Sequence, residues 1–225
     1  MNKRIKKKQL KMRNKKLVER YPWLTPRSVW NDKLPKDYDY TYTEADCFPK
    51  GWRKAFFKEM HEEIRDELIR CNYLNEFRVL QIKEKYGRCC YYFGGIPQDC
   101  NVDDIVRKYE FLSEYICIEC GKLGVHNIPV NGWYSPICEK CYDKHIARLN
   151  RWYDNHGFPP YKYPTYEDVL SKLDIDSKAD IECTLPTVIR NKVRRPGQDW
   201  ETIETDISDT VEKLRRKERN VNWNL

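Results

Sequence analysis

Two pairs of cysteines constrain this chain more than any other feature. Cys117 and Cys120 form one Cys-x-x-Cys pair, Cys138 and Cys141 form another, and 17 residues separate the two pairs. Two intervening residues let the backbone form a tight knuckle, so each pair can place two thiolates around one tetrahedral ion. Gly121 follows the first pair, where such a knuckle often needs a positive φ. Since four protein ligands leave no position for water, we expect a structural Zn²⁺.

The alternative is that these cysteines form two disulfides or are four unrelated thiols. Six further cysteines show no regular spacing: Cys47, Cys71, Cys89, Cys90, Cys100 and Cys183. In a reducing compartment we expect these six to be free or buried thiols, which agrees with a metal site rather than a disulfide framework.

Length and composition favour a folded protein of one or two domains. The chain has 225 residues, of which 34% are charged and 13% aromatic. Disordered chains are poor in aromatic residues, so wholesale disorder is excluded. No apolar run approaches the roughly 20 residues of a membrane span, and the basic N-terminus lacks the apolar stretch of a signal peptide. We therefore expect a soluble protein without a membrane partner, located in the cytoplasm.

The positive charge is concentrated in the first twenty residues, which carry +9 against +7 for the whole chain, so the remainder sums to −2. Such dense like charge predicts an arm that is mobile until it meets an anion. We expect this arm to bind phosphates of nucleic acid, with counterion release supplying much of the affinity. A solubilising tail, or an arm packed on an acidic partner protein, is the alternative. The expected contacts are Lys3, Arg4, Lys6, Lys7, Lys8, Lys11, Arg13, Lys15 and Lys16.

The body of the chain alternates between helix and strand patterns. Apolar residues recur every four positions from Trp52 to Leu68, which predicts one helix over 51–70. Residues 77–93 predict two strands around a turn at Tyr86-Gly87, and 102–116 predict a helix that leads into the first knuckle. Three tyrosines at alternate positions predict an edge strand over 38–42, packed on a helix or, less simply, stacking bases.

The second knuckle begins another expected helix, on which Ile146, Leu149 and Trp152 face inward and which Gly157 terminates. A knuckle, a hairpin and a second knuckle at a helix N-terminus are typical of a treble-clef-like zinc site, with a zinc ribbon as the close alternative. The sequence thus predicts an α+β fold: a small helix–hairpin–helix domain with a four-cysteine site.

Three segments are expected: a basic arm (1–20), a zinc-containing α+β domain (21–156), and a Pro-rich connector with a helical C-terminal extension (157–225). Within the last, the sequence Thr165-x-x-Asp168 predicts a capping box ahead of a short helix. Residues 174–198 look irregular. An apolar stripe from Trp200 through Ile203 to Leu214 predicts a C-terminal helix.

Several segments taken together resemble a known family. The order ERYPWLTPR, GWRKAF, IKEKYG, CIECGK and CEKC is similar to that of a family of small proteins encoded by tailed bacteriophages and prophages of Gram-positive bacteria. The similarity covers about residues 17–142. Relatives tend to have Leu-Arg after the KEKYG glycine, where this chain has Arg88-Cys89-Cys90. The resemblance transfers no activity or catalytic residue, and it implies a viral accessory protein acting in the host bacterial cytoplasm.

One enzyme hypothesis competes with this view. The segment from His126 to Pro129 has the spacing of the general-base strand of HNH-type nucleases, and His145 lies on the helix that follows Cys141. However, Val125 stands where that class has a metal ligand, and Asn131 lies too far before Cys138. The spacing from Cys120 to His126 is also short for that hairpin.

The sequence therefore favours a non-enzymatic phage protein that binds zinc and binds nucleic acid or a host nucleoprotein complex. An inhibitor of a host defence system, of the anti-CRISPR type and acting by binding a host defence protein, is the first alternative. A degenerate or active HNH-type nuclease is the second.

Overall fold

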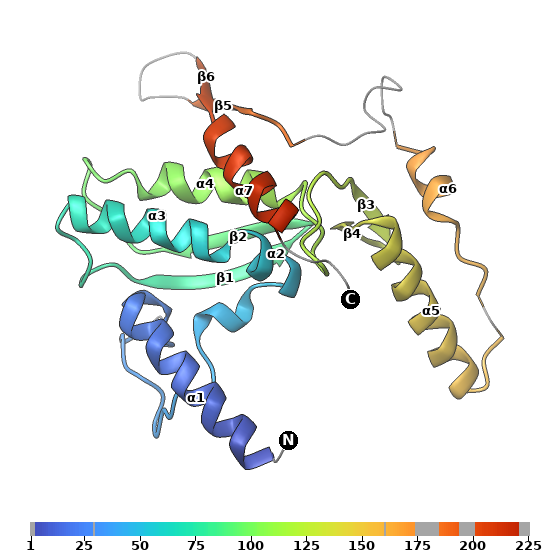
Figure 1. Cartoon of the computed structure of the whole chain (residues 1–225), viewed down its shortest axis with the longest axis horizontal. Coiled ribbons are helices and arrows are strands. Elements are labelled where there is room, and N and C mark those ends of the chain that lie inside the picture. Colours follow the sequence, from blue (N-terminus) through green and yellow to red (C-terminus); the bar gives the residue numbers. More distant parts are fainter. Residues whose placement is uncertain (1–2, 29, 160, 174–184, 194–200, 221–225) are drawn as a thin grey trace. The chain divides into compact units, whose positions relative to one another are not determined.

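The computed structural model describes residues 3–28, 30–159, 161–173, 185–193 and 201–220 (Figure 1). It has mixed helices and small two-stranded sheets, so the α+β class is confirmed. The chain divides into two compact units: Met1–Pro49, Phe56–Lys85 and Cys89–Glu110 form the first, and Lys50–Ala55, Tyr86–Arg88 and Phe111–Leu225 form the second. The second unit therefore contains both the cysteine region and the residues of the expected connector and extension. The three-segment division at 20/21 and 156/157 stays a prediction.

The core of the first unit is aromatic and aliphatic. The helix α3 (Phe57–Arg70) buries Met60, Ile64 and Leu68 completely, as its four-residue repeat predicts. The strands β1 (Val79–Lys85) and β2 (Arg88–Phe93) form the expected hairpin, with Tyr86 and Gly87 both at positive φ in the turn. The helix α4 (Val102–Ser113) contributes further buried residues, and two short 3₁₀ turns lie at Pro22–Leu24 and Glu44–Cys47.

The prediction of one helix over 51–70 is wrong, because α2 (Lys50–Ala55) and α3 are separate helices. The break falls at Phe56, whose φ of −135° is not helical. Long-range hydrogen bonds hold α2 in the second unit. The backbone N–H of Gly51 donates to the carbonyl of Ile118 at 2.8 Å, and the indole N–H of Trp52 donates to the carbonyl of Ile116 at 2.9 Å.

The tyrosine row over 38–42 forms no strand, so that prediction is also wrong. Asp37 and Tyr40 have φ values of 58° and 63°, in the left-handed region that a strand cannot accommodate. The hydroxyl of Tyr38 donates to the carbonyl of Tyr42 at 2.7 Å, which closes a compact loop. The rings of Tyr38 and Tyr40 lie 5.1 Å apart, so they pack on each other instead of forming a row on one face.

Two of the six cysteines expected as thiols are joined in a disulfide. Cys71 at the C-terminal end of α3 pairs with Cys100, 29 residues later and just before α4. The pairing brings together the two ends of the segment that contains the β1–β2 hairpin. Cys47, Cys89 and Cys90 are thiols outside any disulfide, as expected, and Cys183 lies outside the described residues.

The second unit contains the cysteine region. The strands β3 (Asn127–Val130) and β4 (Trp133–Pro136) form an antiparallel hairpin in which Asn127 pairs with Pro136 and Val130 with Trp133. The helix α5 (Glu139–Asn155) follows, and then α6 (Tyr166–Leu170). The capping box of α6 is confirmed, since Thr165 Oγ1 accepts from the Asp168 N–H and the Asp168 carboxylate accepts from the Thr165 N–H.

The C-terminal part differs from its prediction. Part of the expected irregular segment forms the strand β5 (Val188–Val193), which pairs antiparallel with β6 (Glu201–Asp206). Ile203 therefore lies in a strand, and Trp200 lies outside the described residues. The helix begins only at Ser208 and runs to Asn220 (α7). Its inward residues Val211 and Leu214 are buried, as expected.

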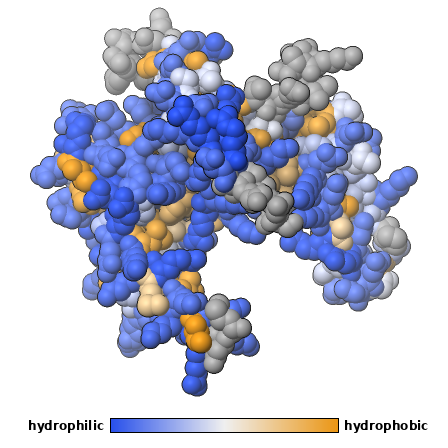
Figure 2. All heavy atoms as spheres, in the orientation of Figure 1, coloured by the Kyte–Doolittle hydropathy of each residue, from blue (hydrophilic) through white to orange (hydrophobic). Residues whose placement is uncertain are grey.

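Hydrophilic residues predominate on the face of the molecule that Figure 2 shows, and apolar residues are scattered among them. Among the described helices, none combines the length and the apolar character that crossing a membrane requires.

Candidate metal centre

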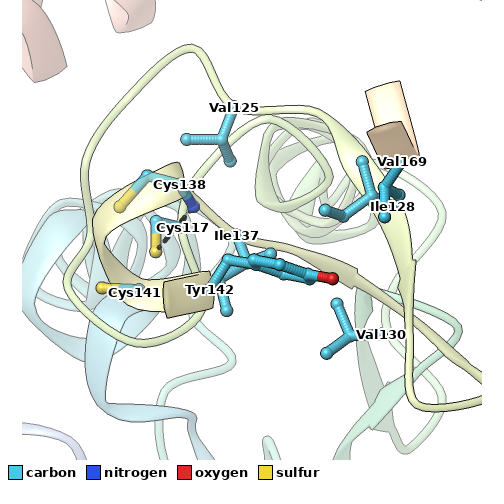
Figure 3. Close-up of a cluster of buried hydrophobic side chains, with 9 residues drawn as sticks. All are labelled: Cys117, Val125, Ile128, Val130, Ile137, Cys138, Cys141, Tyr142 and Val169. Atoms are coloured by element: carbon cyan, nitrogen blue, oxygen red, sulfur yellow. Dashed lines mark hydrogen bonds between the residues drawn. The ribbon is translucent and has the colours of Figure 1, made fainter. Parts of the chain in front are cut away.

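The structure brings Cys117, Cys120, Cys138 and Cys141 into one cluster. Their four sulfur atoms all lie within 4.8 Å of one another, and Cys120 Sγ is 3.8 Å from Cys138 Sγ. In Figure 3 the sulfur atoms of the three cysteines drawn gather on one side of an apolar cluster. Sulfur atoms around a single Zn²⁺ at Zn–S distances of about 2.3 Å would be roughly 3.8 Å apart. The cluster therefore has the size of a tetrahedral metal site.

The first knuckle is a tight backbone turn. The N–H of Gly121 donates to the carbonyl of Cys117 at 2.8 Å, and the N–H of Cys117 donates to the carbonyl of Lys122 at 2.8 Å. Gly121 has a φ of +86°, in the region that favours glycine. A Cβ there would also lie 2.7 Å from the carbonyl oxygen of Gly51. The turn thus requires glycine both for its conformation and for its contact with α2.

The second knuckle lies at the N-terminus of α5. Cys138 precedes the helix, and its carbonyl accepts from the N–H groups of Cys141 and Tyr142, both at 2.9 Å. The β3–β4 hairpin returns the chain to the first knuckle, because its turn residues Asn131 and Gly132 both have the positive φ of a two-residue hairpin turn. The N–H of Ile118 then donates to the carbonyl of Pro136 at 2.8 Å.

The cysteines pack against a cluster of buried apolar residues. Ile128, Ile137 and Tyr142 are buried in it together with three of the four cysteines (Figure 3). Residues of the expected connector join this cluster: the hydroxyl of Tyr142 donates to the carbonyl of Pro164 at 2.8 Å, and that of Tyr166 donates to the carbonyl of Ile137 at 3.0 Å. The cysteine side chains are therefore held by a packed core.

The thiol groups of the cluster affect one another's pKa values. Hydrogen bonds from Cys120 and Cys138 lower the pKa of the Cys117 thiol, which favours one thiolate in the group. Burial, followed by the charges of the neighbouring thiolates, raises the pKa of Cys141 to about 12. Four thiolates this close repel one another unless a cation lies between them. Four sulfur donors in a closed group suit Zn²⁺ and leave no position for substrate.

The predicted nucleic-acid-binding residues lie on α1 (Lys3–Arg20) in the first unit, whereas the cysteines lie in the second. Eight of the nine side chains are exposed; Lys11 is half-buried and binds Asp39 at 2.5 Å. The expectation of a mobile arm is wrong, because α1 is anchored at three points besides the Lys11–Asp39 ion pair. The Asn14 side chain is buried and donates to the carbonyl of Tyr40 at 2.9 Å, Val18 is buried, and Arg20 makes a bidentate pair with Glu62.

The residues of the nuclease hypothesis lie apart from the cysteine cluster, and the buried Nε2 of His126 has no hydrogen-bond partner among the described residues. Asn131 lies in the hairpin turn, and the ring of His145 receives a hydrogen bond of 3.0 Å from Arg148. The carbonyl of His126 accepts from the N–H of Ile137 at 3.3 Å, beside the strands. Within the described part of the chain, the cysteine cluster is the only group of three or more His, Cys, Asp or Glu side chains close enough to hold a metal. His126 and His145 do not belong to it.

One charged surface was missed in the sequence. The prediction that Trp152 lies in the core is wrong. Lys140, Lys144, Arg148 and Arg151 are all exposed on α5, at spacings of four, four and three residues. That spacing places them on one helix face and could have revealed them. Trp152, expected to face the core, is 50% exposed.

Comparisons with protein-family models, with curated proteins and with solved structures find no match to this chain.

Proposed function

We propose that this protein is a non-enzymatic zinc-binding protein that binds nucleic acid, either alone or within a host nucleoprotein complex. The four-sulfur cluster carries the zinc part of the proposal, since its closed donor set leaves no position for a reacting group. Its knuckle–hairpin–helix order supports a treble-clef-like site. The proposal includes a phage origin and action in the host bacterial cytoplasm, and these rest on the sequence resemblance alone.

The charge on α1 supports the nucleic-acid part. Nine exposed cations, of which Arg20 is paired with Glu62, lie on a helix of 18 residues whose only acidic residue is Glu19. The anchors of α1 all lie at or after Lys11, and the exposed cations Lys3, Arg4, Lys6, Lys7 and Lys8 precede them. A helix anchored at one end presents its cations to an extended anion, and each phosphate neutralised releases counterions.

Salt dependence of binding tests this proposal. Lys6→Gln/Lys7→Gln/Lys8→Gln removes three exposed cations without touching the anchors. Fluorescence anisotropy with a labelled oligonucleotide at several salt concentrations should show a slope lower in magnitude by about 2 to 3, because each lost phosphate contact removes roughly 0.7 to 0.9. The matched control is Lys33→Gln/Lys36→Gln/Lys58→Gln, three exposed lysines elsewhere in the first unit. Equal slopes for the two triple variants would contradict a role for α1.

A second candidate function has its own observation. Trp133 and Tyr134, adjacent on β4, are 69% and 50% exposed. Exposed tryptophan and tyrosine are enriched at the centres of protein–protein interfaces, which favours the alternative of an inhibitor that binds a host defence protein. Capture of such a partner from nuclease-treated lysate, lost in Trp133→Ala and retained in Trp152→Ala, would support this candidate over nucleic-acid binding.

A further inference from the structure

One face of α5 carries a row of four cations. At about 100° per residue, Lys140, Lys144, Arg148 and Arg151 fall within an arc of roughly 80°. The row is about 16 Å long at 1.5 Å per residue, which is enough to lie along a few consecutive phosphates of a strand. None of the four forms an ion pair with another residue that the structure describes.

A hollow of about 480 Å³ lies along this row, beside the metal centre. Exposed Ala147 leaves room between the longer side chains, and Cys141 connects the hollow to the cysteine cluster. Glu119 is the one acidic residue that lines it, while Asp143 and Asp154 lie on the adjoining helix face. The lining residues are Glu119, Cys141, Lys144, His145, Ala147, Arg148 and Arg151.

Exposed aromatic rings border the row at its C-terminal end. Trp152 lies next to Arg151 and is 50% exposed. Its ring stacks on His156 with centroids 4.2 Å apart, and it is nearly parallel to the ring of Phe158, at 9°. Phe158 is 53% exposed. Half-exposed parallel rings beside a basic row form the combination that proteins use to bind single strands, in which cations contact the backbone and aromatic rings stack on unpaired bases.

We propose that this face of α5 binds single-stranded nucleic acid, with the four cations on the phosphates and the Trp152 cluster stacked on a base. The inference rests on the proposed function and gives it a second surface, in the unit that holds the metal centre. The four cations favour a polyanion as the partner, and the exposed rings of the Trp152 cluster favour a partner that also has flat rings. Every nucleotide of a single strand offers both a phosphate and a flat ring, whereas most residues of an acidic peptide offer no ring.

Two variants separate the two kinds of contact. Lys144→Gln/Arg148→Gln/Arg151→Gln should lower the magnitude of the salt slope for oligo(dT) binding by about 2, at roughly 0.7 per phosphate contact. Trp152→Ala should weaken binding about 5- to 150-fold at every salt concentration without changing the slope, because stacking releases no counterions. Trp30→Ala, at a tryptophan that is 93% exposed, is the matched control for stacking. Lys33→Gln/Lys36→Gln/Lys58→Gln is the control for lost charge.

Each outcome has one meaning. If the wild type binds no oligonucleotide, the proposed function fails and the α5 surface fails with it. If the α1 variant binds weakly while both α5 variants match their controls, the function stands and the α5 assignment is wrong. Competition by polyglutamate as effective as that by oligo(dT) would also overturn it, in favour of an acidic peptide. If the triple variant folds poorly, ultraviolet crosslinking of wild-type protein to oligo(dT) tests the α5 surface instead. Crosslinked peptides are expected from residues 140–158, and their absence there would contradict the assignment.

Discussion

Trp52 and Ile116 are joined by a hydrogen bond of 2.9 Å from the indole N–H to the backbone carbonyl. The neighbouring Gly51 donates its backbone N–H to the carbonyl of Ile118 at 2.8 Å. Two consecutive residues of α2 therefore bind the residues on either side of Cys117. The helix α2 thus holds the backbone of the first knuckle in place. We therefore expect metal binding to depend on residues far from the cysteines in sequence.

Loss of the metal should unfold the cysteine region first. We expect purified protein to contain one zinc per chain by elemental analysis, and Cys117→Ser/Cys120→Ser to lose it, because zinc binding supplies folding free energy. Hydrogen exchange in the double variant should accelerate over residues 116–146 and change less in α3, in the other unit. Cys47→Ser, at an exposed cysteine outside the cluster, is the control. Unchanged zinc content in the double variant would refute the assignment.

A methyl group at position 51 should displace α2 from the knuckle. A Cβ on Gly51 would lie 2.1 Å from the carbonyl oxygen of Cys117 and 2.6 Å from that of Ile118, and neither backbone atom can rotate away. Gly51→Ala is expected to lower the free energy of unfolding by about 2 kcal/mol or more and to speed zinc release to a chelator. Gly95→Ala, where nothing lies within 4 Å, should behave as wild type. Similar chemical denaturation curves for the two variants would contradict the close contact.

The free energy of unfolding should decrease as the pH is lowered below 7, because of His61. This side chain is fully buried, its Nδ1 lies 2.7 Å from the carbonyl of Phe57, and its Nε2 lies 3.3 Å from the hydroxyl of Tyr91. A carbonyl only accepts, so Nδ1 carries the proton of a neutral ring and Nε2 accepts from Tyr91. Burial lowers the pKa of His61 from 6.5 to about 4, while the hydrogen bond to Phe57 and then the charge of Glu62 act in the opposite direction.

The sign follows from proton binding. Between pH 6.5 and 4 the unfolded chain takes up a proton on His61 that the folded chain does not, so lowering the pH favours unfolding. The contribution reaches roughly 3 kcal/mol at pH 4, at 1.36 kcal/mol per unit. Urea denaturation from pH 7 to 4 should show this loss, and His61→Gln should reduce the slope with pH. His156→Gln, at an exposed position, serves as the control; if it reduces the slope equally, His61 is not the cause.

The disulfide between Cys71 and Cys100 gives a further prediction. Peptide mapping of protein alkylated before reduction should recover the two residues in one linked species. Opening a loop of 29 residues should cost roughly 3.5 kcal/mol, through the greater entropy of the unfolded chain. Cys71→Ala/Cys100→Ala should therefore melt several degrees below wild type, and reductant should lower the melting temperature of wild type but not of the variant. Recovery of both residues as alkylated thiols would contradict the pairing.

Local patterns in the sequence were sufficient for several elements. The cysteine spacing predicts the cluster because each knuckle needs only its own two ligands, and the Thr165–Asp168 capping box and the Tyr86-Gly87 turn depend on adjacent residues. The break at Phe56 could not be predicted in this way, since its cause is the bond from Trp52 to a carbonyl 64 residues away. The same holds for Cys71 and Cys100. The basic face of α5 was readable, but its cations are spread at helical spacing and so are less conspicuous than the dense run in α1.

The contacts of α7 have a consequence for the order in which the chain assembles. Lys217 Nζ donates to the carbonyl of Ala55 at 3.0 Å, across 162 residues, and Glu218 accepts from the N–H of Leu123 at 2.9 Å. During synthesis all four cysteines leave the ribosome well before α7 is made. Metal uptake can therefore precede closure of the unit, and the late helix then secures a knuckle that is already formed.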